Sequence, residues 1–439
     1  METEQPISNK ATFQNYLFLW IGQNFSYLGS AIVAFVIILQ LAGGENYVLS
    51  VAAISSFGPS ILFGALAGVI ADRFNKKVII IITDSLQALA TLALIILYYS
   101  PITVVPWHIY VILAFRGVCQ AFHGPVVSAL TPLMVPKEKL SRMNGIGYLF
   151  SSLIGIIGPV VGVAILLVLK VEEALWIDVI SYVLAMIPLF FVKIPKVNQK
   201  SEGSEKTEKH SFWKDMKEGF ALLRIVPGAL SMMFLAMILN MLLQPTNVLF
   251  PNYILVELSK SELILGYVSA AFPAGILVGS IITSVKKNWK NKAKWILVGL
   301  SFTAISYSLL VVPKLLPDSY FFLIFVLSFL MAVFIPIVNV LLITIMQKIV
   351  PVDKFGRISS LMMVLSSIAT PIGMIGSGFL ADGLTPISGS MGGIGFTYVL
   401  CGIVMLFVSI LTYMFTDWKK MGSNGSSDDA GETIEETSS

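Results

Sequence analysis

The sequence has little charge for its length. Of its 439 residues only 12% are Asp, Glu, Lys or Arg, whereas soluble domains carry about 25%. It contains two cysteines, Cys119 and Cys401, and both lie in apolar segments, so neither a disulfide framework nor a zinc site is indicated. No G-x-x-x-x-G-K-[ST] phosphate loop is present, which disfavours an ATP-driven pump. We therefore expect no cofactor, no metal and no enzyme activity.

Hydrophobic residues, in contrast, make up 56% of the chain. A lipid bilayer accommodates such a composition, because a helix of about 20 apolar residues satisfies its own backbone hydrogen bonds within the hydrocarbon. The sequence predicts an all-α integral membrane protein with twelve transmembrane helices. Their predicted bounds are 13–42, 47–71, 78–99, 108–134, 145–169, 174–192, 226–256, 262–285, 295–312, 320–347, 358–381 and 396–416.

The distribution of basic residues predicts the orientation of these helices. Of the 29 Lys and Arg residues, 25 fall in the tails and in one set of alternate loops. Only Lys170, Lys260 and Lys314 fall in the other set, and Arg116 lies within a predicted helix. Because cytoplasmic loops retain Lys and Arg, we expect a multi-pass protein of the cell membrane with both termini in the cytoplasm. The basic residues form no stripe, so no nucleic-acid partner is expected.

Polar segments divide the chain. Residues 1–12 lack the basic region of a secretory signal peptide and are expected to form a cytoplasmic tail. Residues 193–225 separate six predicted helices from six, and their Ser, Glu, Lys and Gly content is typical of a flexible linker. Within the linker, 212–223 could lie on the membrane face as an amphipathic segment. Residues 418–439 are acidic and almost free of apolar residues, which predicts disorder.

The two sets of six helices resemble each other in sequence. A shift of 215 residues aligns VPKEKLSR (135–142) with VPVDKFGR (350–357), and SFGPSILFGALAG (56–68) with AFPAGILVGSIIT (271–283). One offset that serves two separate segments indicates parallel structural repeats. We expect two pseudo-symmetric six-helix bundles at 13–192 and 226–417, the arrangement of alternating-access transporters with the major facilitator fold.

The end of the second helix reads GVIADRFNKK (68–77). It resembles the G-x-x-x-D-R-x-G-R-K signature of the major facilitator superfamily, with Asn75 where the family usually has Gly. The resemblance implies a latch that holds the two halves in the outward-facing state; an ordinary basic loop is the alternative. Asp84, further along the next helix, is compatible with the latch or with proton coupling. The candidate latch residues are Gly68, Asp72, Arg73, Lys76, Lys77, Asp84 and Arg142.

The fifth helix carries GIIGPVVG (155–162), in which Gly158 and Pro159 are followed by Gly162. Small residues allow close helix packing, and the proline interrupts a backbone hydrogen bond. The segment resembles the G-P-x-x-G core of the antiporter motif in proton-coupled drug exporters, although Val163 replaces a further Gly. Close helix packing without any role in antiport is the alternative.

Arg116 is the one basic residue deep within a predicted helix. A charge there is costly, so it should face an acidic or polar partner inside the bundle. Its position resembles the helix 4 arginine that the family associates with proton transfer. Asp178 is the leading proton carrier, with solvation at the outer helix end as the alternative. His123 can titrate near neutral pH, but a neutral structural histidine is favoured. The candidates for proton coupling are Arg116, Asp178, His123 and Glu257.

Polar side chains in otherwise apolar helices mark a candidate substrate cavity. They are Gln23, Asn24, Tyr27, Gln120, Asn240, Gln244, Asn247 and Asn339. Hydrogen bonds between helices are the alternative role for such residues. With few polar groups and many Met, Phe and Tyr side chains, the cavity suits a bulky amphipathic molecule, because soft side chains repack around different shapes.

The segments WIGQ, ADRFNKK and AFHGPVVSALTPLMVP resemble the macrolide-efflux branch of the drug:proton antiporters, and the likeness spans residues 13–416. It implies a secondary transporter that exports amphipathic small molecules, such as macrolide-like drugs, in exchange for protons and so confers antibiotic resistance. Transport of lysophospholipids or siderophores, and a non-transporting receptor on the same fold, are the alternatives. The expected partners are the substrate, protons and membrane lipids, and we expect a monomer.

Overall fold

The computed structural model describes residues 10–192, 194, 229–286, 289–349, 362 and 364–415. The side chains of Asp72 and Arg73 are not among those described. Three predicted segments fall outside the described residues almost entirely: the N-terminal tail, the linker with its amphipathic segment, and the acidic C-terminal tail.

Within the described ranges all regular elements are helices, and twelve helical segments are long and apolar enough to span a membrane. The predicted fold class and number of spans are confirmed. One bound moves appreciably: helix α5 (Lys137–Leu166) begins eight residues before the predicted 145. Its first two turns, KEKLSRMN, are mostly polar, so a search for apolar runs could not include them. Pro136 is the N-cap residue of this helix.

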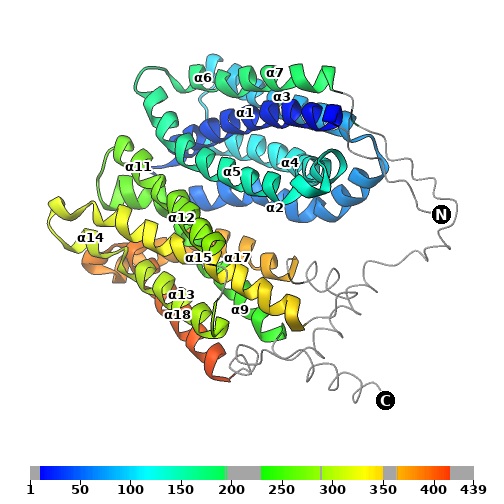
Figure 1. The fold of residues 1–439 in the computed structure, drawn as a ribbon. Coiled ribbons are helices and arrows are strands. Elements are labelled where there is room, and N and C mark those ends of the chain that lie inside the picture. Colours follow the sequence, from blue (N-terminus) through cyan, green and yellow to red (C-terminus); the bar gives the residue numbers. More distant parts are fainter. Residues whose placement is uncertain are drawn as a thin grey trace. The chain divides into compact units, whose positions relative to one another are not determined.

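The chain divides into two compact units, and the first comprises residues 1–199 together with 251–270. Its helices run roughly side by side, from blue to green in Figure 1. Helix α2 packs on α4, and α1 packs on both α5 and α7. The elements of this unit are α1 (Lys10–Leu41), α2 (Asn46–Arg73), α3 (Lys76–Tyr99), α4 (Pro106–Met134), α5, α6 (Val171–Ala174), α7 (Trp176–Phe191), the π-helix η1 (Tyr253–Glu257) and α11 (Glu262–Ser269).

The second unit comprises residues 200–250 and 271–439. Helix α12 packs on α15, as α2 packs on α4 in the first unit, so the second membrane helix of each repeat contacts the fourth. Helix α13 packs on α15 and α18. The elements are α9 (Ala229–Leu242), α10 (Gln244–Asn252), α12 (Ala271–Val285), α13 (Lys292–Leu309), α14 (Val312–Leu315), η2 (Asp318–Tyr320), α15 (Leu323–Ile349), α17 (Thr370–Leu384), η3 (Thr385–Ile387), η4 (Gly389–Met391) and α18 (Gly393–Phe415), with the last two residues of α10 belonging to the first unit.

Two of these helix pairs approach so closely that only glycine fits at the contact. A Cβ atom on Gly117 of α4 would collide with the carbonyl oxygen of Ser56 on α2. In the second unit a Cβ atom on Gly279 of α12 would collide with the carbonyl oxygen of Val333 on α15. Backbone stands against backbone at both places, so a side chain cannot be accommodated by a change of rotamer.

We expect Gly117→Ala to lower the free energy of unfolding by about 1–3 kcal/mol, the usual cost of overpacking a well-packed contact. Gly124→Ala is the matched control on the same helix, because nothing lies within 4 Å of a Cβ atom at that position. Thermal unfolding of the purified variants in detergent measures the difference. Equal melting temperatures for the two variants would contradict the close contact of α2 and α4.

Candidate functional site

Arg116 and Asp178 form an ion pair inside the first unit. An Nη atom of Arg116 on α4 lies 2.5 Å from Oδ2 of Asp178 on α7. The two side chains are 13% and 5% exposed, so both charges are largely withdrawn from solvent. Asp178 is therefore not solvated at the helix end, and Arg116 has the acidic partner that its depth in the membrane requires.

Hydroxyl groups from two further helices complete the surroundings of Asp178. Thr91 on α3 donates to Oδ2 of the carboxylate at 2.5 Å, and Ser30 on α1 donates to Oδ1 at 2.5 Å. The guanidinium of Arg116 also reaches the hydroxyls of Thr91 and Ser30. Four helices thus meet at one carboxylate, and its two oxygens accept three hydrogen bonds.

A second polar group joins α1, α3 and α4. Nε2 of His123 lies 3.0 Å from Oδ1 of Asp84 and 3.1 Å from Oε1 of Gln23. The Gln23 amide donates to Oδ2 of Asp84 at 3.2 Å. Two hydrogen bonds and one histidine–carboxylate contact thus connect three side chains, which we call the His123 triad (Gln23, Asp84 and His123).

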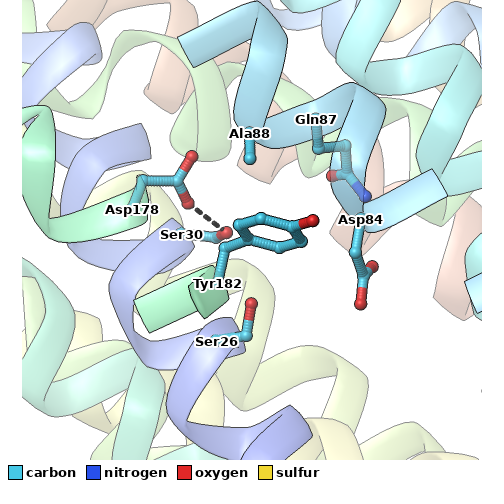
Figure 2. A pocket seen from close by; sticks show the side chains of 7 residues that line it. All are labelled: Ser26, Ser30, Asp84, Gln87, Ala88, Asp178 and Tyr182. Carbon is cyan, nitrogen blue, oxygen red and sulfur yellow. Dashed lines mark hydrogen bonds between the residues drawn. The ribbon is translucent and has the colours of Figure 1, made fainter. Parts of the chain in front are cut away.

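A small pocket lies beside both groups, with Asp84 and Asp178 on different sides of it (Figure 2). It offers about 20 Å³ to the centres of water molecules, which is enough for one water. Tyr182 borders it and shares a hydrogen bond of 2.8 Å with Ser85. The residues that line the pocket are Ser26, Ser30, Asp84, Gln87, Ala88, Asp178 and Tyr182.

Helical spacing brings these side chains together. On α3, Asp84, Gln87 and Thr91 follow the i, i+3, i+7 pattern of a single helix face. On α1, Gln23 and Ser30 are likewise seven residues apart. Sequence reasoning singled out Asp84 and Gln23 but missed Thr91 and Ser30. Their helical spacing from Asp84 and Gln23 could have identified them, because it puts them on the same helix faces.

Among the candidate latch residues, the lysines contact backbone. Lys77 donates to the carbonyls of Phe190 and Val192 at 3.0 Å, and Lys76 donates to the carbonyl of Ala71 at 3.3 Å. Gly68 lies in α2, and Arg142 is exposed near the start of α5. The structure brings Asp84 together with His123. Since the side chains of Asp72 and Arg73 are not described, the latch stays a prediction.

The candidate antiporter motif lies where α5 packs on α1. A Cβ atom on Gly158 would lie 3.4 Å from the Cβ atom of Ala31, and one on Gly162 would lie 3.3 Å from the ring of Phe35. On the side of α5 that faces α11, a Cβ atom on Gly266 of α11 would lie 3.3 Å from the carbonyl oxygen of Pro159. Close packing of the helices is therefore sufficient to explain why small residues occupy these positions. A role in antiport stays a prediction.

Three of the remaining candidates form hydrogen bonds within their own compact unit. Asn24 donates to the carbonyl of Trp20, Asn240 to that of Ser366, and Gln244 to that of Asn240. Glu257, at the end of η1, is partly exposed. The side chains that remain exposed are Tyr27, Gln120, Asn247 and Asn339.

Sequence reasoning also missed Asn252, which is fully buried. Its amide oxygen accepts from the backbone N–H of Gly43, and its amide nitrogen donates to the carbonyl of Gly44 and to the side chain of Asn46, each at 2.9 Å. The side chain therefore fastens the loop between α1 and α2 to the end of α10, within the first unit.

We expect Asp178→Asn to lower the free energy of unfolding by about 3–5 kcal/mol, because it leaves the buried Arg116 charge without a counter-ion. The double variant Arg116→Met, Asp178→Leu removes both charges and should recover most of that loss. Thermal unfolding of both variants in detergent makes the comparison. A double variant as unstable as Asp178→Asn would argue against the ion pair.

Comparison with known proteins agrees with this architecture. The chain is 28% identical to Macrolide efflux protein A of Streptococcus pyogenes over 92% of this chain and 96% of that protein. It is 29% identical to Macrolide efflux protein A of Enterococcus faecalis over 75% of this chain and all of that protein. Among solved structures, a D-xylose-proton symporter shares the fold with a TM-score of 0.69 at 12% identity, covering 94% of this chain and 98% of that one. The sequence profile described as Major Facilitator Superfamily matches residues 19–284 and 229–436, and the chain therefore belongs to this family of membrane transporters.

Proposed function

We propose that this transporter exports amphipathic small molecules, macrolide-like drugs among them, in exchange for protons and by alternating access. The observation that carries the proposal is the buried polar cluster of Arg116, Asp178, Asp84 and His123 in helices that span the membrane. Ionisable side chains within a bilayer are expensive and are retained chiefly on ion and proton pathways. A cluster that contains both carboxylates and a histidine has the chemistry for binding and releasing a proton.

The nature of the cargo is inferred from the cavity candidates and from the relatives. The chain is rich in soft and aromatic side chains, with 18 Met and 28 Phe, which suit bulky apolar molecules of varied shape. Tyr27 and Gln120 are exposed polar side chains on α1 and α4 and supply a few hydrogen-bonding positions. The relatives at 28% and 29% identity are named for macrolide efflux. These features support an amphipathic cargo, whose extrusion would confer resistance.

Alternating access requires two bundles that move against each other. We assign them to residues 13–192 and 226–417, with the GVIADRFNKK segment (68–77) as the latch. In this proposal the protein works as a monomer in the cell membrane, with both termini in the cytoplasm, and lipids cover its apolar surface.

The central test uses proteoliposomes with an acidic interior. The purified protein should drive accumulation of radiolabelled erythromycin above the level of protein-free liposomes, which measure passive trapping of this weak base. Asp178→Asn should abolish the difference, because the cluster then loses one of its two carboxylates. Glu262→Gln, which alters an exposed carboxylate at the start of α11, is the matched control and should transport normally. If the wild-type protein moves no substrate under any gradient, the non-transporting receptor is the better description.

The orientation is tested by cysteine labelling in a background with Cys119→Ala and Cys401→Ala. In intact cells a membrane-impermeant maleimide should label Glu45→Cys, in the exposed loop between α1 and α2, because this loop belongs to the set that is poor in Lys and Arg. Glu138→Cys, exposed at the start of α5, should be labelled only after permeabilisation. The reverse pattern would contradict the proposed orientation.

A further inference from the structure

We propose that the exchanged proton is carried by the His123 triad, while the Arg116–Asp178 pair stays ionised as a fixed element. This inference rests on the proton exchange proposed above, and it names the group that performs it. Two carboxylates lie in the buried cluster, so the question is which of them has a partner that can gain and lose a proton.

The surroundings of Asp178 oppose its protonation while Arg116 is in place. Its oxygens accept from Ser30, Thr91 and Arg116, all at 2.5 Å. Protonation would remove a charge-assisted hydrogen bond and leave the guanidinium buried without a counter-ion. Arginine itself does not deprotonate in proteins. The pair is therefore neutral as a unit, and it stays so throughout the cycle.

The histidine geometry fixes the position of one proton. Nε2 of His123 faces two acceptors, a carboxylate oxygen of Asp84 and the amide oxygen of Gln23. The Gln23 amide is held in this orientation because its nitrogen donates to the other oxygen of Asp84. While Asp84 is ionised, Nε2 carries the hydrogen, since two acceptors cannot bind each other. Nδ1 remains as the atom that takes up and gives back a proton.

The charge balance of the cluster favours one such proton. Arg116 and Asp178 cancel, whereas Asp84 carries a negative charge that a neutral His123 leaves uncompensated. When a proton carried by water forms an N–H bond at Nδ1, the imidazolium balances Asp84 and the buried cluster becomes neutral. When that bond breaks and the proton returns to water, the excess negative charge reappears. Because an unbalanced charge within the membrane is costly, proton binding changes the stability of this conformation.

The surroundings of His123 leave this role open to it. Within the described chain its polar contacts are with Gln23 of α1 and Asp84 of α3. The other ionisable groups of the cluster are Arg116 on its own helix and Asp178 on α7. The His123 side chain is 16% exposed, compared with 5% for Asp178. The protein therefore encloses the histidine less completely than it encloses Asp178.

The test compares coupled transport with exchange in His123→Gln, whose amide can still donate to Asp84 but cannot titrate. With two pH units across the membrane, one proton per cargo sustains up to about 100-fold accumulation of erythromycin. His123→Gln should reduce the accumulation to the protein-free level and still exchange labelled for unlabelled erythromycin without a gradient. His108→Gln is the matched control, since His108 accepts a hydrogen bond from the N–H of Val105 at the start of α4 and should keep coupling.

The outcomes separate this inference from the proposed function. If the wild-type protein does not accumulate erythromycin, proton exchange itself fails. If wild type and His123→Gln accumulate it equally, proton exchange stands and the assignment to His123 is wrong.

A second measurement does not depend on the variant folding. The wild-type chain has three histidines, so imidazole ¹⁵N spectra of labelled protein in detergent can be assigned with His108→Gln and His210→Gln. His123 should show a neutral ring with hydrogen on Nε2 at alkaline pH and an imidazolium at acidic pH. A ring that keeps one protonation state from pH 5 to pH 9 would overturn the proposal.

Discussion

The buried ion pair of Arg116 and Asp178 is the constraint on which the first unit depends. Taking two charges out of water costs several kcal/mol per ion, and the attraction between them repays this only when the remaining hydrogen-bonding positions are filled. Thr91 and Ser30 fill them from α3 and α1. The pair therefore fixes the rotation of four helices about their own axes, since turning any one of them would remove a donor or a charge. The same rotations place Gln23 and Asp84 where His123 can reach both.

Much of this could be predicted from the sequence, and the limit has a physical cause. Twelve helices follow from apolar runs, because a bilayer demands internally bonded segments of set length. Arg116 had to find a partner for the same reason. Arg116 and its partner Asp178 are 62 residues apart in the sequence. Which carboxylate Arg116 meets depends on how their two helices are rotated about their axes, and no local sequence pattern encodes that rotation. Asp178 looked close to a solvated helix end, yet it is only 4% exposed.

The compact units show a similar limit for domain boundaries. The repeat places the break between the halves in the segment 193–225, but residues 251–270 group with the first unit. Asn252 explains part of this, because three hydrogen bonds tie it to the loop between α1 and α2. The packing of α11 on α5, with Gly266 against Pro159, explains the rest. Sequence similarity records ancestry, whereas compactness records the contacts of one conformation, and the two need not divide a chain at the same residue.

The distribution of buried polar groups bears on the proposed coupling of one proton to varied cargo. Among the described residues the buried carboxylates are Asp84 and Asp178, and both belong to the first unit. In the described part of the second unit the buried polar side chains carry amides and hydroxyls, such as Gln244 and Thr303. Proton binding requires fixed partners at hydrogen-bonding distance, whereas a pocket for bulky apolar molecules requires side chains that can repack. In the proposed mechanism, confining the buried charges to one cluster meets the first demand without imposing a fixed pattern of charges on the cargo.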